Sequence, residues 1–132
     1  MDNLDITEFD PALVNVSVAT TYLPGHSRPE DDQYTFAYTI TINNDSDLPV
    51  QLLSRHWVIT DADNHVEEVR GEGVVGEQPH LKPGEVFRYT SGTVIETPVG
   101  TMEGEYGMLG DDGQEFLTPV DRFSLSVPRV LH

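Results

Sequence analysis

Hydrophobic and polar residues alternate with a period of two along most of this chain, the pattern of strands that bury one face. The clearest case is residues 34–42, where Tyr, Phe and Ile occupy one face and Thr and Ala the other. The strands predicted on these grounds cover residues 14–23, 34–42, 50–61, 66–70, 86–90, 93–95, 102–108, 114–117 and 123–127. The only tryptophan, Trp57, shares a face with Leu53 and Ile59, so we expect it to anchor the core.

Clusters of Pro, Gly, Asn and Asp separate these strands and indicate tight turns. The turn signals lie at residues 24–25, 43–47, 62–65, 81–84, 97–100 and 110–113. No capped amphipathic helix of respectable length is recognisable in the sequence. Short strands separated by such turns indicate an all-β protein, and specifically an antiparallel β-sandwich of about seven strands.

The length of 132 residues fits one domain with one core. We expect a flexible acidic N-terminal arm at residues 1–12 and a single β-sandwich domain at residues 13–132. No apolar run approaches the roughly 20 residues that cross a bilayer, and the N-terminus lacks the features of a signal peptide. The chain has no cysteine, which excludes a disulfide framework and a thiolate zinc site. These features favour a cytoplasmic protein without membrane insertion.

The chain is strongly acidic, with 23 Asp and Glu against 7 Lys and Arg and a formal net charge of −16. A surface this negative repels phosphate backbones, so nucleic-acid binding is disfavoured. Solubility explains the charge without any partner. Attraction of cations or of a basic partner is the less favoured alternative, and the charge alone does not choose between them.

The segment Gly71-Glu72-Gly73-Val74-Val75-Gly76-Glu77-Gln78-Pro79 has the glycine spacing G-x-G-x-x-G. In dinucleotide-binding folds these glycines open a helix whose N-terminal amides hold a pyrophosphate. Here two prolines follow at positions 79 and 83 with no helix-forming segment, and two glutamates would repel phosphates. We therefore interpret the glycines as permitting unusual backbone angles in a loop between strands.

No metal site is readable from the sequence. His56, His65 and His80 are far apart, and none forms a close pair with another ligand type. Alternation places His56 opposite the tryptophan face, which favours a hydrogen-bonding role. Glu103 and Glu105 share a strand face and could contact a hard cation weakly, but they lack an EF-hand spacing.

No catalytic set is recognisable either. The chain lacks a cysteine nucleophile and a G-x-S-x-G elbow. Ser54 and His56 share a strand face without an evident third partner. The sequence therefore predicts a protein that is not an enzyme and that carries no cofactor.

Several segments in order resemble the ApaG family. They are Arg55-His56-Trp57-Val58-Ile59-Thr60-Asp61, the glycine segment 71–79, Tyr89-Thr90-Ser91-Gly92 and Thr97-Pro98-Val99-Gly100-Thr101-Met102-Glu103-Gly104. The resemblance implies an immunoglobulin-like or fibronectin type III-like β-sandwich. It also implies an association with cobalt resistance and with magnesium and cobalt efflux. Related domains in eukaryotic proteins look like protein-interaction modules, and the family supplies no catalytic residues.

The leading hypothesis is a non-enzymatic binding domain that influences divalent-cation homeostasis by contacting an unidentified protein partner. We expect the contact surface to comprise His56, Gly71, Gly73, Gly76, Glu77, Gln78 and His80. One alternative is a module that senses a small ligand, a weakly bound divalent cation or a phosphate. A hydrolase of nucleotides or pyrophosphates is a further alternative. The sequence leaves open whether the chain is a monomer or a homodimer.

Overall fold

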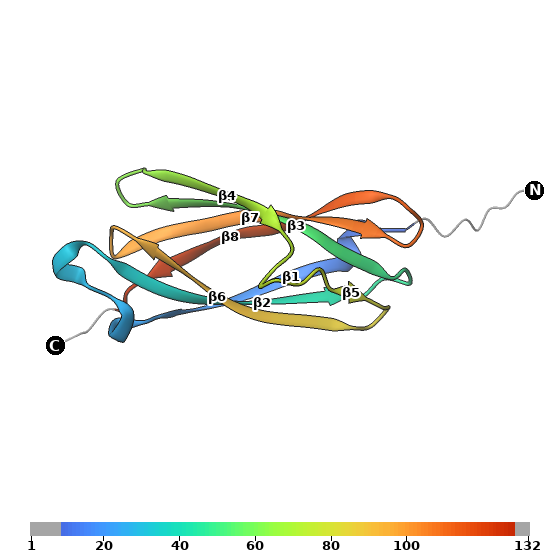
Figure 1. The fold of residues 1–132 in the computed structure, drawn as a ribbon, viewed down its shortest axis with the longest axis horizontal. Helices are drawn as coiled ribbons and strands as arrows, with labels where there is room; N and C mark the ends of the chain where they lie inside the picture. Colours follow the sequence, from blue (N-terminus) through green and yellow to red (C-terminus); the bar gives the residue numbers. More distant parts are fainter. Residues whose placement is uncertain (1–8, 129–132) are drawn as a thin grey trace, which may run out of the picture.

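A computed structural model describes residues 9–128 of the chain. Two antiparallel sheets lie face to face and enclose one hydrophobic core (Figure 1). The described strands are β1 (Val14–Tyr22), β2 (Tyr34–Asn44), β3 (Val50–Asp61), β4 (Val66–Glu72), β5 (His80–Leu81), β6 (Val86–Ile95), β7 (Val99–Gly110) and β8 (Glu115–Ser126). Of three single 3₁₀ turns, η1 (Pro11–Leu13) precedes β1, and η2 (Pro24–His26) and η3 (Pro29–Asp31) lie between β1 and β2. None of the helical segments in this range has the length or apolar character to cross a membrane.

The smaller sheet has the strand order β1-β2-β6, and the larger has the order β4-β3-β7-β8 with β5 also pairing with β3. The expected all-β antiparallel sandwich is confirmed. In an immunoglobulin constant domain, the fourth strand completes the sheet of the first, second and fifth strands. Here β4 instead lies beside β3 in the opposite sheet. The three-stranded sheet therefore ends at β6, which pairs with β2 alone within residues 9–128.

The core forms from the inward faces of β2, β3 and β7. On β2 the expected alternation is confirmed, with Phe36 and Ile40 almost completely buried. Trp57 is 3% exposed and lies edge-on to Tyr106, with ring centroids 5.9 Å apart. Such edge-to-face packing is favoured by aromatic quadrupoles. The predicted role of Trp57 as the core anchor is therefore confirmed.

Two strands run continuously where the sequence indicated breaks. The segments 86–90 and 93–95 form the single strand β6, and the segments 114–117 and 123–127 lie in or beside the single strand β8. Gly92 lies within β6 and pairs with Ala37, and a Cβ there would stand in ordinary van der Waals contact, at 3.4 Å, with the carbonyl oxygen of Phe36. This glycine therefore continues the strand and does not form a turn. With the short β5 added, the described range holds eight strands in place of about seven.

The turn expected at residues 43–47 begins later than its composition indicated. Asn43 and Asn44 belong to β2, and Asn44 is fully buried. The Asn44 side-chain amide donates hydrogen bonds to the carbonyl oxygens of Leu48 at 2.8 Å and Leu81 at 3.0 Å, while its oxygen accepts one from the Ser46 hydroxyl. An amide whose donors and acceptor all have hydrogen-bond partners can be buried without a large desolvation cost.

A β-bulge in β3 changes which side chains face the core. The pairing of β3 with β7 shifts register between Leu52 and Ser54. Before the bulge, Leu52 is buried with 0% exposure, and after it the buried positions are Trp57 and Ile59. The expectation that Leu53 shares the face of Trp57 is wrong, because the extra residue of a bulge interrupts the alternation.

The two sides of the sandwich are closed to different degrees. On one side β1 and β8 pack closely against each other. On the other side β4 and β6 form the edges of their sheets, and the space between them is a cleft. Residues 1–8 of the expected N-terminal arm lie outside the described residues. Phe9, which follows them, packs on Phe116 with ring centroids 5.0 Å apart.

Candidate functional site

The glycine segment folds as the end of β4 followed by a tight turn. The backbone N–H of Val74 donates to the carbonyl of Glu77 at 2.8 Å, and the N–H of Glu77 donates back at 2.9 Å. The two central residues, Val75 and Gly76, have φ angles of 43° and 80°. Two consecutive positive φ angles in a doubly bonded four-residue loop define a type I′ turn. The Val74–Glu77 turn places Val75 on the surface, where it is 55% exposed.

Two of the glycines meet different physical demands. Gly73 has a φ of +65°, and a Cβ there would stand 2.3 Å from the Glu77 carbonyl oxygen. Gly76 also has a positive φ, of +80°, but a Cβ there would meet no atom within 4 Å. Both positions favour glycine through their backbone angles. At position 73 glycine is also required because the turn folds back over it and leaves no room for a Cβ.

Arg55 forms hydrogen bonds with the backbone at the start of this turn. Its Nη1 donates hydrogen bonds to the carbonyl oxygens of Glu72 at 3.0 Å and Gly73 at 2.8 Å. The guanidinium also covers Gly71, where a Cβ would stand 2.7 Å from Nη2. The planar fork of an arginine suits two neighbouring acceptors. Arg55 can reach them because, after the bulge, its side chain lies on the same inward face of β3 as Trp57.

Hydrogen bonds also fasten the segment that descends from the turn. The side-chain amide of Gln78 donates to the Leu53 carbonyl at 2.9 Å, and that of Gln51 donates to the Gln78 carbonyl at 3.1 Å. The Leu52 N–H donates to the carbonyl of Pro79 at 3.0 Å. The bulged part of β3 therefore fixes this side of the loop, and the turn is a rigid projection.

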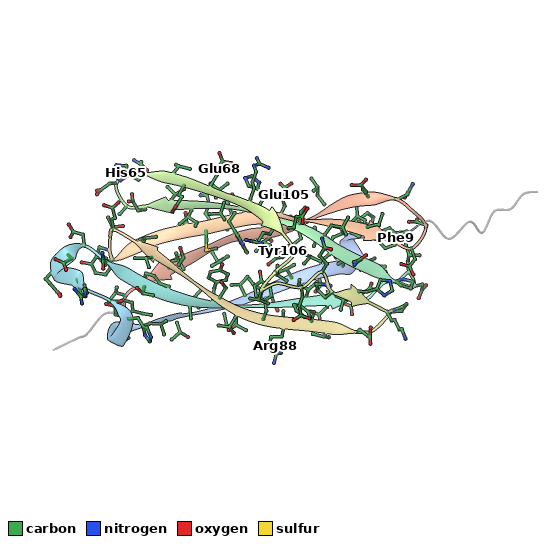
Figure 2. The ribbon with its side chains drawn as sticks, viewed as in Figure 1. Phe9, His65, Glu68, Arg88, Glu105 and Tyr106 are labelled. Carbon is green, nitrogen blue, oxygen red and sulfur yellow. The ribbon has the colours of Figure 1, made fainter. Side chains whose placement is uncertain are left out.

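The structure does not bring the two expected histidines together. His56 faces the outer surface of the larger sheet, where its Nε2 lies 2.8 Å from a carboxylate oxygen of Glu68 (Figure 2 labels Glu68 on this surface). His80 pairs across the ladder with Gln51, five positions before His56 on β3, and its Nε2 lies 2.9 Å from Asp111. Each imidazole therefore has its own carboxylate. The structure instead places Gly71, Gly73, Gly76, Glu77 and Gln78 together in the turn and its flanks.

A cleft runs along the open side of the sandwich and ends at the turn. Its largest part has a volume of about 350 Å³, with Tyr38, Trp57 and Met102 among its lining residues. A second part of about 230 Å³ continues beneath Val74–Gly76 and shares Arg55 and Ser91 with the first. A third part of about 240 Å³ lies toward Glu96. Because neighbouring parts share lining residues, the cleft extends from the turn to the start of β4 and the end of β6.

The two ends of the cleft carry opposite charges. Asp61, Glu67 and Glu96 line one end, and Arg55 lines the other. Burial opposes ionisation of the Asp61 carboxylate, but hydrogen bonds from the backbone N–H groups of His65 and Asp63 and from the His65 imidazole outweigh it. The pKa of Asp61 is therefore lowered from its ordinary value of 3.8. The Asp61 carboxylate therefore stays ionised at neutral pH.

The Arg55 end contains a buried pair of tyrosines. The hydroxyls of Tyr89 and Tyr106 form a short hydrogen bond, and the two residues are 7% and 0% exposed. In Figure 2 Tyr106 lies between the two sheets. Burial raises the pKa of both phenols far above their ordinary value of 10. Both hydroxyls therefore stay protonated and serve as hydrogen-bonding groups.

Sequence reasoning missed the cleft and Arg55. The signal was present, since Arg55 has the same parity as Trp57 and Ile59 and alternation would place its charge on the core side. An inward-facing charge requires buried acceptors, which the turn supplies. Within residues 9–128, no group of three or more His, Cys, Asp and Glu side chains is arranged to hold a metal ion. The arrangement offers a rigid turn and an elongated cleft with apolar and charged walls.

Comparisons with known proteins place this architecture in context. A family model described as the ApaG domain matches residues 24–110. Protein ApaG of Ralstonia nicotianae is 59% identical over 119 residues, which cover 90% of this chain and 96% of that protein. Protein ApaG of Thiobacillus denitrificans is 58% identical over 119 residues, with coverages of 90% and 94%. A crystal structure from Bordetella pertussis, of a protein provisionally named ApaA, is 49% identical, has a TM-score of 0.87 and covers 92% of this chain and 97% of its own.

Proposed function

We propose, from the premise that this chain belongs to the ApaG family, that it is a non-enzymatic protein-binding domain of the cytoplasm. Its partner contacts the Val74–Glu77 turn and the cleft that the turn borders. The observation that carries the proposal is the rigidity of the turn, which hydrogen bonds from Arg55 and Gln78 fix on both sides. A rigid projection on a sandwich loses little conformational entropy on binding, which favours recognition.

The character of the exposed groups supports a protein partner. Val75 presents an apolar side chain at the tip of the turn, and the side chain of Glu77 presents a charge at its base. A protein interface typically combines an apolar centre with a polar rim. The glycines determine the shape of the turn, and Val75 and Glu77 supply the chemistry that a partner contacts. His56 and His80 belong to the expected surface, but they lie outside this turn.

The proposed link to cobalt and magnesium runs through the partner. The family resemblance associates such chains with resistance to cobalt and with efflux of magnesium and cobalt. A domain that binds a transport or regulatory protein can alter efflux without holding the cation itself. The net charge of −16 adds a preference for a partner surface that is basic.

A charge reversal on the turn tests the proposal. Partner recovery from a lysate of the source organism is compared between the immobilised wild-type chain and its Glu77→Lys variant. Glu115→Lys, an exposed position on β8, is the matched control for the change in net charge. We expect Glu77→Lys to reduce recovery of a specific partner at least about tenfold, because reversing an interfacial charge costs more than about 1.4 kcal/mol. Equal recovery with both variants would remove the turn from the interface.

Calorimetric titration distinguishes this function from direct ligand sensing. The free chain is titrated with Co²⁺, Mg²⁺ and a nucleoside triphosphate in separate experiments. The proposal expects no saturable heat and no thermal stabilisation at millimolar concentration, since a ligand that binds only the native state must stabilise it. Saturable binding of either cation would replace partner binding with cation sensing as the primary activity.

A further inference from the structure

We infer that the free edge of β6 between Ser91 and Ile95 is a β-augmentation site, which binds an extended peptide segment bearing a basic side chain followed by apolar ones. This inference rests on the proposed function, because it states how a protein partner is held. Addition of a strand to an exposed sheet edge is a common mode of peptide recognition. The cleft and the ladder pattern identify both the edge and the chemistry of the segment.

Hydrogen bonds alternate along β6, and this alternation shows which of its backbone N–H and C=O groups do not bond to β2. The Asn44 N–H donates to the carbonyl of Glu85, which fixes the phase of the β2–β6 ladder. In an antiparallel pair, alternate residues bond to the neighbouring strand. Odd-numbered residues of β6 therefore bond to β2, and the N–H and C=O groups of Thr90, Gly92 and Val94 point away from it. The side chains of Thr90 and Val94 lie on the outer face, as that of Arg88 does in Figure 2.

The other sheet edges are less suitable for augmentation. The edge of β4 carries Glu67, Glu68 and Arg70, and such charges protect edges from pairing. The edge of β1 is packed against β8, and β8 contains Pro119, which cannot donate to a ladder. Residues 91–95 of β6 contain no charged side chain and no proline. This part of β6 also borders the position that the fourth strand of an immunoglobulin constant domain occupies.

The cleft beside this edge receives one face of an added strand. The cleft wall opposite Thr93 includes the partly buried Val69 together with Trp57 and Met102, which are almost completely buried, and this apolar wall accepts apolar side chains. Toward Ile95, the wall carries Asp61, Glu67 and Glu96. An antiparallel segment therefore places a basic residue near its N-terminal end and apolar residues at the next inward positions. Because this wall is acidic, the segment that binds here carries a basic residue near its N-terminus.

The turn limits the length of the added segment. Val74, Val75 and Gly76 line the cleft together with Tyr89 and Ser91, so the turn stands across the start of the free edge. The open edge therefore extends from Ser91 to Ile95, which accommodates about five or six residues at about 3.4 Å each. A segment of this length makes only a few main-chain hydrogen bonds, which suits a reversible interaction.

The test uses a synthetic hexapeptide on the full chain. The probe is acetyl-Lys-Thr-Val-Thr-Val-Thr-amide, whose lysine and two valines share one face of a strand. Binding is measured by the chemical shifts of backbone amides and by the fluorescence of Trp57, the single tryptophan and a lining residue of the cleft. We expect saturable binding, with the largest amide shifts at Gly92 and Val94. Replacing the lysine of the probe by glutamate should weaken binding about tenfold.

A proline at the edge separates augmentation from simple contact with the cleft. Val94→Pro removes an N–H that does not bond to β2, so the sandwich should keep its fold, as circular dichroism and thermal unfolding verify. We expect this variant to bind the probe about tenfold more weakly, because a ladder hydrogen bond is lost. Val94→Thr retains the N–H and is the matched control, with affinity within about twofold of the wild type. A probe N-methylated at its second and fourth residues, the threonines that lie opposite Val94 and Gly92 and donate to the ladder, provides the same test from the peptide side.

The outcomes separate this inference from the proposed function. Equal affinity of the lysine probe for the wild type and a folded Val94→Pro variant would overturn augmentation, as would shifts confined to β1 or β4. Pairing of β6 with a second copy of the chain would overturn it as well, and sedimentation analysis would show a dimer that Val94→Pro abolishes. If Glu77→Lys lowers partner recovery while Val94→Pro leaves it unchanged, the proposed function stands and the augmentation site is rejected. If the probe binds the β6 edge while Glu77→Lys leaves partner recovery unchanged, the augmentation site stands and the proposed role of the turn is rejected.

Discussion

Replacement of Gly73 by alanine tests whether space, as well as backbone conformation, shapes the turn. An alanine at a φ of +65° costs about 1–2 kcal/mol. Its Cβ would also stand 2.3 Å from the carbonyl oxygen of Glu77, an atom held in place by the backbone bond to Val74. Forcing that carbonyl away adds about 1–3 kcal/mol, as overpacking of a rigid site does. We expect Gly73→Ala to lower the free energy of unfolding by about 2–5 kcal/mol.

The matched control is Gly76→Ala. It has the same sign of φ, but its Cβ would meet no atom within 4 Å, so only the cost of about 1–2 kcal/mol for the backbone remains. Urea unfolding followed by the fluorescence of Trp57 measures both variants against the wild type. The difference between them isolates the contact with Glu77. If the two variants differ by less than about 0.5 kcal/mol, the close approach at Gly73 is not a determinant of the turn.

Two further predictions concern the buried tyrosine pair and Asp61. Tyr106→Phe should lower the free energy of unfolding by about 1–2 kcal/mol, because it leaves the buried hydroxyl of Tyr89 without its partner. The double variant with Tyr89→Phe should cost less than the sum of the single changes, and additive values in this double-mutant cycle would show that the hydroxyls are not coupled. The lowered pKa of Asp61 predicts a stabilisation that is complete above pH 3.8 and disappears as the pH falls through the folded-state pKa. The stability advantage of the wild type over Asp61→Asn, measured by urea unfolding from pH 7 to pH 2.5, should therefore shrink below about pH 4, and a constant difference would contradict this.

The sheets were largely predictable because their alternation is strict. Residues such as Phe36 and Ile40 have no polar neighbour that competes for their face, so period-two counting places them in the core. Trp57 was identified by the same counting. Leu53 was misplaced because a bulge interrupts alternation without a distinctive residue type, and nothing in the local sequence distinguishes it from regular strand. The break expected between residues 90 and 93 was wrong because the register with β2 continues through Ser91 and Gly92 without a shift.

The expectation that no helix directly follows the glycine segment is confirmed, since the strands β5 and β6 follow it. Its detailed form was not predictable, because the turn depends on contacts distant in sequence. Arg55 reaches Gly73 across 18 positions, and Gln78 reaches Leu53 across 25. The cleft likewise results from the absence of a fourth strand beside β6, which is a property of topology and not of any single segment.

The bulge at Leu53 determines where the chain can change in length. In an ordinary loop, the loss of one residue shortens a connection and leaves its flanks in place. Deletion of Leu53 would restore regular alternation with Val50, Leu52 and Trp57 still on one face, but it would remove the carbonyl oxygen that accepts hydrogen bonds from the Gly73 N–H and the Gln78 side-chain amide. Insertions and deletions among members of this family should therefore avoid this stretch and collect in turns such as residues 62–64. Alignments of distant relatives should be built without gaps there.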